Sequence, residues 1–105
     1  MFAVIYEFEA LPGKEEAFIQ GWRRLTELIY EYENSRGSRL HHVGGQTYVA
    51  YATWPDELTW KHSGGNMPEE EANEARQMMR DNMAGSKTVY SMNMLDDLLQ
   101  DKPHH

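Results

Sequence analysis

The chain has 105 residues, which predicts a single domain, and its 17 acidic and 10 basic residues give a net charge of −7. This acidic balance argues against binding to nucleic acid or anionic membranes, because neutralising phosphate needs clustered lysine and arginine. The absence of cysteine excludes disulfides, thiol nucleophiles and thiolate metal sites. No apolar run approaches the roughly 20 residues that span a bilayer, and no signal peptide is recognisable, so we expect a cytoplasmic protein.

The first third of the sequence predicts a strand followed by an amphipathic helix. Residues 2–10 alternate in the manner of a strand, and a Leu-Pro-Gly turn ends it. A helix is expected from Lys14 until residues 34–37, because apolar residues recur there at spacings of three and four. One face of the strand carries Phe2, Val4, Tyr6 and Phe8, and the helix stripe carries Phe18, Trp22, Leu25, Ile29 and Tyr32.

A β-hairpin is expected in the middle of the chain. Its strands should span residues 38–43 and 47–54, joined by a tight turn at Gly44-Gly45. The second of these strands has no clearly polar face, which indicates a central strand covered on both sides. One face carries Tyr48, Ala50, Ala52 and Trp54. The two alanines leave room above the sheet beside a large aromatic residue, which indicates a pocket, although a closely packed helix would explain the pattern as well.

The second half of the sequence predicts a short helix, a longer helix and a last strand. Pro55 ends the hairpin strand and opens the short helix, with acidic residues in its first turn. After a flexible break at 63–66, Pro68 opens the longer helix, which should end near Gly85, and the last strand should span residues 88–95. The expected inner face of the longer helix carries Ala72, Ala75, Met79 and Met83, with Met78 alongside.

This order of elements predicts an α+β, ferredoxin-like βαββαβ fold with a four-stranded antiparallel sheet. Both long helices should cover one face of the sheet, with the first and third strands central. Because the strands carry apolar residues on both faces, the uncovered face would be an unusually large apolar patch for a monomer. We therefore expect a homodimer formed through this open face. The domain should span residues 1–96, and residues 97–105 should form a C-terminal tail, with 102–105 a frayed end.

The sequence resembles the antibiotic biosynthesis monooxygenase (ABM) family of dimeric α+β barrels over residues 2 to about 95. The stretches that carry the resemblance are YEFEALPGKEEAFIQGWRRL, GSRLHH with its Gly-Gly turn, and YVAYATWPDELTW. The resemblance implies a cofactor-independent monooxygenase that oxidises a small quinol- or anthrone-type aromatic with O2. Trp54 matches an aromatic residue that lines the family's pocket, whereas Ala50 stands where the polyketide oxygenases have a polar amide.

A haem-degrading activity is not favoured. In the superfamily that this sequence resembles, the haem-degrading members share a site of asparagine, tryptophan and histidine. The asparagine is in the first strand and the histidine is in the last long helix. Here Glu7 lies near the first position, and residues 68–84 contain no histidine. We therefore expect no haem, flavin or other cofactor.

An oxygenase of this kind must bind a flat phenol, help to remove a proton and exclude water. The candidate catalytic residues are His62, Trp54 and Tyr51, and the candidate substrate-binding residues are Phe18, Trp22, Trp60, His42 and Arg23. Large aromatic residues also serve core and interface packing, and a loop histidine is often simply solvated. His41 and His42 point to opposite faces of a strand, so no metal site is expected. The alternative function is a non-enzymatic module of the same fold that binds a small ligand or serves as a structural dimer.

Overall fold

The computed structural model describes residues 1–100, so the frayed end predicted at 102–105 lies outside the described residues. Its elements follow the predicted order, with a short helix between the hairpin and the second long helix. They are β1 (Phe2–Ala10), α1 (Glu15–Tyr32), β2 (Ser38–Gly44), β3 (Thr47–Trp54), α2 (Glu57–Lys61), α3 (Glu69–Asp81) and β4 (Met83–Asn93).

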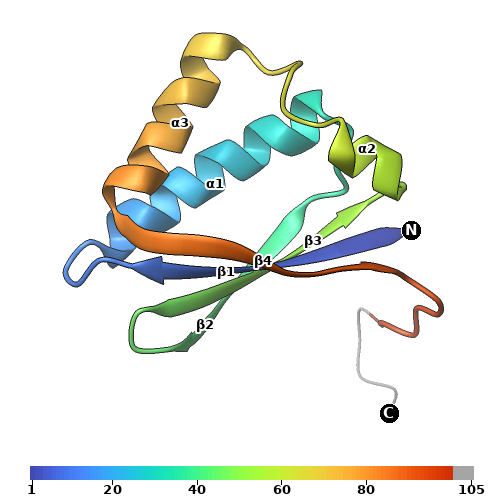
Figure 1. Cartoon of the computed structure of the whole chain (residues 1–105), viewed down its shortest axis with the longest axis horizontal. Helices are drawn as coiled ribbons and strands as arrows, with labels where there is room; N and C mark the ends of the chain where they lie inside the picture. Colours follow the sequence, from blue (N-terminus) through green and yellow to red (C-terminus); the bar gives the residue numbers. More distant parts are fainter. Residues whose placement is uncertain (101–105) are drawn as a thin grey trace.

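The four strands form one antiparallel sheet in the order β2-β3-β1-β4. The two strands predicted to be central, β1 and β3, pair from Phe2 opposite Trp54 to Glu9 opposite Thr47. Figure 1 shows α1 and α3 on the same side of the sheet, while the segment after β4 turns to the other side. The predicted ferredoxin-like fold is therefore confirmed. One sheet face is covered by helices, and the other is the open face.

The boundary between α3 and β4 differs from the prediction. The helix ends at Asp81 and β4 begins at Met83, so Gly85 lies inside the strand instead of stopping the helix. Asn82 closes the helix, since its backbone N–H donates to the carbonyl of Met79 at 3.1 Å. Residues 84–88 lack apolar alternation because this edge strand is exposed, and they become a strand by pairing with β1.

The hairpin turn also lies one residue later than predicted. Gly44 still pairs with Thr47, so Gly45 and Gln46 form the two-residue loop. Gly44 and Gly45 both have positive φ, at 153° and 54°, which a residue with a Cβ rarely adopts. The two glycines are therefore needed where the sequence analysis placed them, although only one is in the loop.

The centre of the core is an aromatic cluster between α1 and the sheet. Phe18 of α1 is 0 % exposed, and its ring centroid lies 5.4 Å from those of both Phe8 and Tyr48. The two long helices approach closely at Gly21, where an added Cβ would lie 3.0 Å from the backbone nitrogen of Met79. This close approach fixes the height of α3 above the sheet.

A buried carboxylate anchors the loop that leads into α3. Glu33, directly after α1, is 4 % exposed and accepts hydrogen bonds from the backbone N–H and the side-chain amide of Asn66 at 2.8 and 2.9 Å. Burial acts to raise the pKa of Glu33, but hydrogen bonds from Asn66 and from the backbone of Gly64 and Met67 outweigh it and lower the pKa overall. The ionised carboxylate thus stabilises the folded state.

We expect Glu33→Gln to lower the free energy of unfolding at neutral pH by about 1–3 kcal/mol, because an amide leaves buried donors without a charged acceptor. A group whose pKa is lowered by folding stabilises the protein above its unfolded pKa, near 4.5, and loses that contribution as the pH falls through the folded value. Urea unfolding of both proteins should therefore show a difference that shrinks below pH 4.5. A difference independent of pH, or an equal effect of Glu31→Gln at an exposed position of α1, would contradict this role.

Candidate functional site

A cavity of about 510 Å³ lies between the helix-covered face of the sheet and the helices α1 and α3. Its volume is within the range of roughly 300–1,000 Å³ that is usual for small-molecule sites. The residues that line it from the sheet include Tyr6, Ser38, Ala50, Ala52, Trp54 and Thr88, and those from the helices include Trp22, Leu25, Thr26, Ile29, Arg76, Met79 and Arg80.

The cavity exists because the sheet carries small side chains at its centre. Ala50 and Ala52 of β3 face the helices, and Ala52 is paired with Ser38 of β2, another small residue. Trp54 stands on the same face of β3, two residues further along. The pocket predicted from the alternation of alanine and tryptophan is confirmed.

Trp54 lines this cavity and also carries a buried hydrogen-bond donor. The residue is 3 % exposed, and its indole Nε1 is buried without an acceptor among residues 1–100. A buried donor without a partner costs about 1–3 kcal/mol, so such a group is informative. Because this nitrogen has almost no accessible surface, a ligand in the cavity would not reach it without a movement of the surrounding side chains.

Tyr6 of β1 lines the cavity with a positioned hydroxyl. Trp60 of α2 donates a hydrogen bond from its Nε1 to the Tyr6 hydroxyl oxygen at 2.8 Å. Burial raises the pKa of Tyr6, and the smaller effect of the hydrogen bond from Trp60 opposes it. The phenol is therefore neutral at physiological pH, and its own O–H can donate into the cavity.

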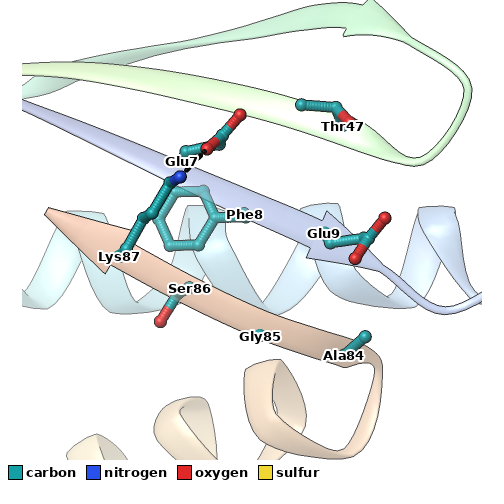
Figure 2. Close-up of a pocket in the computed structure, with 8 residues that line it drawn as sticks. All are labelled: Glu7, Phe8, Glu9, Thr47, Ala84, Gly85, Ser86 and Lys87. Atoms are coloured by element: carbon teal, nitrogen blue, oxygen red, sulfur yellow. Dashed lines mark ion pairs between the residues drawn. The ribbon is translucent and has the colours of Figure 1, made fainter. Parts of the chain in front are cut away.

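Two further hollows lie elsewhere on the molecule. Figure 2 shows the first, of about 280 Å³, where Lys87 of β4 reaches Glu7 of β1 at 3.1 Å, with Glu9 and Thr47 nearby. It contains one aromatic side chain, Phe8, and is otherwise small or charged. The second, of about 640 Å³, separates the open face of the sheet from the C-terminal segment 94–99. Neither has the aromatic walls of the sheet–helix cavity.

The sheet–helix cavity is lined by two of the residues predicted from the sequence, Trp54 and Trp22. Phe18 lies in the core cluster beside it and is not among the lining residues. Trp60 is half-buried against Phe2, at a centroid distance of 5.6 Å, and reaches the cavity only through its hydrogen bond to Tyr6.

The other four predicted residues lie away from this cavity. Tyr51 is on the open face, because it alternates with the residues of β3 that face the helices. His62 is exposed at the end of α2, and Arg23 is exposed on α1. His42 is exposed near the hairpin turn, with its ring 4.9 Å from that of Tyr48.

The sequence analysis did not single out three polar residues that line the cavity: Tyr6, Arg76 and Arg80. Tyr6 shares a strand face with three apolar residues, so its pattern indicated core packing alone. The two arginines are four residues apart on α3 and flank the apolar stripe that contains Met79, which places them on one side of the helix. Their spacing of four residues, beside the apolar stripe, was the feature of the sequence that could have identified them as cavity residues.

Within residues 1–100, no three histidine, aspartate or glutamate side chains gather closely enough to hold a metal ion. The described helices also include none with the length and apolar character needed to cross a membrane.

The sequence matches no family model, and it matches no curated protein. Solved structures do match it. SnoaB from Streptomyces nogalater, a cofactor-independent oxygenase, aligns with a TM-score of 0.74 and 14% identity over 94% of this chain and 97% of its own. Rv0793 from Mycobacterium tuberculosis aligns with a TM-score of 0.70 and 14% identity over 93% and 98% of the two chains.

A third solved structure, named an antibiotic biosynthesis monooxygenase, aligns with a TM-score of 0.68 and 16% identity over 91% of this chain and 100% of its own. The fold of the present chain is therefore the α+β fold of the antibiotic biosynthesis monooxygenases, over nearly its whole length. At these identities the likeness concerns the fold, and the chemistry must be argued from the cavity.

Proposed function

We propose that this protein is a member of the ABM family and a cofactor-independent monooxygenase that oxidises a small quinol- or anthrone-type aromatic with O2. The observation that carries the proposal is the sheet–helix cavity, with an alanine floor, walls from Trp22, Trp54 and Tyr6, and a volume of about 510 Å³. Support comes from the fold, which is shared with a cofactor-independent oxygenase over 94% of the chain. Cytoplasmic location is part of the same proposal.

The reaction balances without an added reductant. An anthrone loses a proton from its methylene carbon, and the resulting enolate passes one electron to O2. Recombination of the radical pair forms a carbon–oxygen bond and a hydroperoxide, which loses water to leave a quinone carbonyl. One oxygen atom enters the product, the other leaves as water, and the substrate supplies all four electrons.

The side chains supply binding and charge stabilisation in this scheme. The aromatic walls hold the flat ring and keep water from the radical pair. The hydroxyl of Tyr6 donates to the enolate oxygen as its negative charge develops. No carboxylate or imidazole lines the cavity in residues 1–100, so the proton passes to solvent before the radical pair forms, and the Tyr6 hydroxyl stabilises the anion.

Oxygen uptake tests this function directly. The purified protein is mixed with anthrone or a substituted hydroquinone in metal-free buffer, and O2 consumption is followed with an electrode. We expect uptake well above the spontaneous rate, with conversion of anthrone to anthraquinone and of the hydroquinone to a hydroxylated quinone, each with release of one water. Uptake at the spontaneous rate across both substrate types would refute the proposal.

We also propose that two copies pair through the open face of the sheet. That face and the segment after β4 expose apolar side chains that the chain itself does not cover, including Tyr90 at 63 % exposure and Leu95 at 95 %. The hollow of about 640 Å³ on the open face has the cationic Arg39 on the sheet and the acidic Asp96 and Asp97 on the C-terminal segment. A second copy would bury the apolar groups and could pair these charges across the interface.

Tyr90→Asp should convert the dimer into a monomer, because it places a charge in the apolar interface. Sedimentation of the unmodified protein at micromolar concentration should give about twice the chain mass of 12.3 kDa, and the variant should give the single-chain mass. Tyr30→Asp is the matched control, since Tyr30 is 53 % exposed on α1 and lies on the helical side. A monomeric unmodified protein, or a dimer that survives Tyr90→Asp, would contradict the pairing.

The second candidate function is ligand binding without chemistry. It is favoured by Ala50, which places a methyl group where a polar anchor is implied by the family resemblance. It is also favoured by the absence of a carboxylate or imidazole among the lining residues within 1–100. Saturable binding of a quinone or anthrone without O2 uptake would select this function over the oxygenase.

A further inference from the structure

The charged residues that line the sheet–helix cavity are basic, whereas the protein as a whole has a negative net charge. The chain has 17 acidic and 10 basic residues, yet no acidic side chain from residues 1–100 lines this cavity. Three basic residues are among the lining residues, Arg76, Arg80 and Lys87, although the Lys87 ammonium pairs with Glu7 on the other face of the sheet. Such a lining attracts an anion and repels a cation, whatever the net charge of the surface.

The three basic residues are not equally available. Lys87 pairs with Glu7 at 3.1 Å, as Figure 2 shows, and Arg80 donates to the side-chain oxygen of Gln77 at 3.1 Å. Arg76 is half-buried, and it forms no ion pair or side-chain hydrogen bond with any other residue in 1–100. Among the basic residues that line the cavity, Arg76 is thus the one without a protein partner in residues 1–100.

The loop beside Arg76 is anchored by a carboxylate that has other partners. The Nη2 of Arg76 lies 3.8 Å from the position that a Cβ on Gly64 would take, beside the loop into α3. The buried carboxylate that anchors this loop, Glu33, is occupied by Asn66. By contrast, Arg24 on α1 is exposed and pairs with Glu71 of α3 at 2.7 Å. The helix pair thus neutralises an arginine at the surface and leaves the one at the cavity free.

We propose that the cavity binds an aromatic carboxylate and that Arg76 pairs with the carboxylate group. This inference rests on the proposed function and narrows its substrate class to ring systems that carry a carboxylate besides the oxidisable phenol or anthrone. A guanidinium matches a carboxylate in a bidentate geometry, and partial burial strengthens the pair. Trp22 and Trp54 provide the walls for the ring.

Binding of two probes that differ only in charge tests the inference. Anthraquinone-2-carboxylate and its neutral carboxamide are titrated against the full chain by isothermal calorimetry at low salt. We expect the carboxylate to bind at least about tenfold more tightly, the range for a hydrogen-bonded charge pair, and to lose this advantage as salt is added. Arg76→Gln should reduce the advantage to near parity while leaving carboxamide binding almost unchanged.

Arg36→Gln is the matched control, because Arg36 is exposed and lines no part of the cavity, and thermal unfolding shows whether each variant is folded. Equal affinities for the two probes, a charge preference that survives Arg76→Gln, or binding of neither probe would overturn the inference. Oxygen uptake separates it from the proposed function. Uptake with neutral anthrone but no charge preference refutes the inference alone, whereas an Arg76-dependent preference without uptake refutes the oxygenase alone.

Discussion

Phe18→Ala is expected to lower the free energy of unfolding by about 3–5 kcal/mol, the usual cost of removing a fully buried phenylalanine. The side chain is 0 % exposed and packs between Phe8 and Tyr48, so truncation removes two aromatic contacts and leaves a void. Since a domain of this size is stable by only about 5–15 kcal/mol, the variant should be marginally folded. Urea unfolding monitored by circular dichroism measures the loss.

Leu58→Ala is the control for Phe18→Ala, because Leu58 is 65 % exposed on α2 and its truncation should cost less than about 0.5 kcal/mol. The comparison also separates two roles for Phe18. If Phe18 bound substrate and contributed little to the core, Phe18→Ala would weaken ligand binding and leave the free energy of unfolding nearly unchanged. That outcome would contradict the core position that the structure gives to this residue.

Ala52→Phe should reduce ligand binding and any O2 uptake to background, a loss of at least about 100-fold, because the ring would occupy the cavity itself. The substitution fills existing space, so its cost in stability should stay below the roughly 1–3 kcal/mol typical of overpacking. Calorimetric titration with anthraquinone-2-carboxylate measures the affinity, and thermal unfolding measures the stability.

Leu58→Phe adds an aromatic ring at an exposed site and serves as the matched control for Ala52→Phe. It should leave both affinity and uptake unchanged. If Ala52→Phe remains folded and binds the probe as tightly as the unmodified protein, the ligand does not occupy the sheet–helix cavity.

The sequence predicted the fold well where periodicity was strong. The alternation of β3 fixed which side chains face the helices, and the alanines at 50 and 52 beside Trp54 indicated the cavity that the structure contains. The early part of β4 was missed because its residues are exposed and polar, and only pairing with β1 makes them a strand. Pairing between strands far apart in the sequence is a tertiary effect, so the local sequence of residues 83–87 could not predict it.

The site was predicted less completely than the fold. Tyr51 and Trp54 were grouped together for their chemistry, although an odd spacing on one strand places them on opposite faces. Conversely, Arg76 belongs to the cavity only because Gly21 allows α3 to lie close to α1. A contact between two helices far apart in the sequence decides that position, so composition and spacing could not identify it.

A crystal structure of the protein with anthraquinone-2-carboxylate is the most direct measurement of where the ligand binds. We expect the ring between the tryptophans at 22 and 54, a ring oxygen within hydrogen-bond distance of the Tyr6 hydroxyl, and the carboxylate at Arg76. An empty sheet–helix cavity with the ligand on the open face would contradict our account of the site.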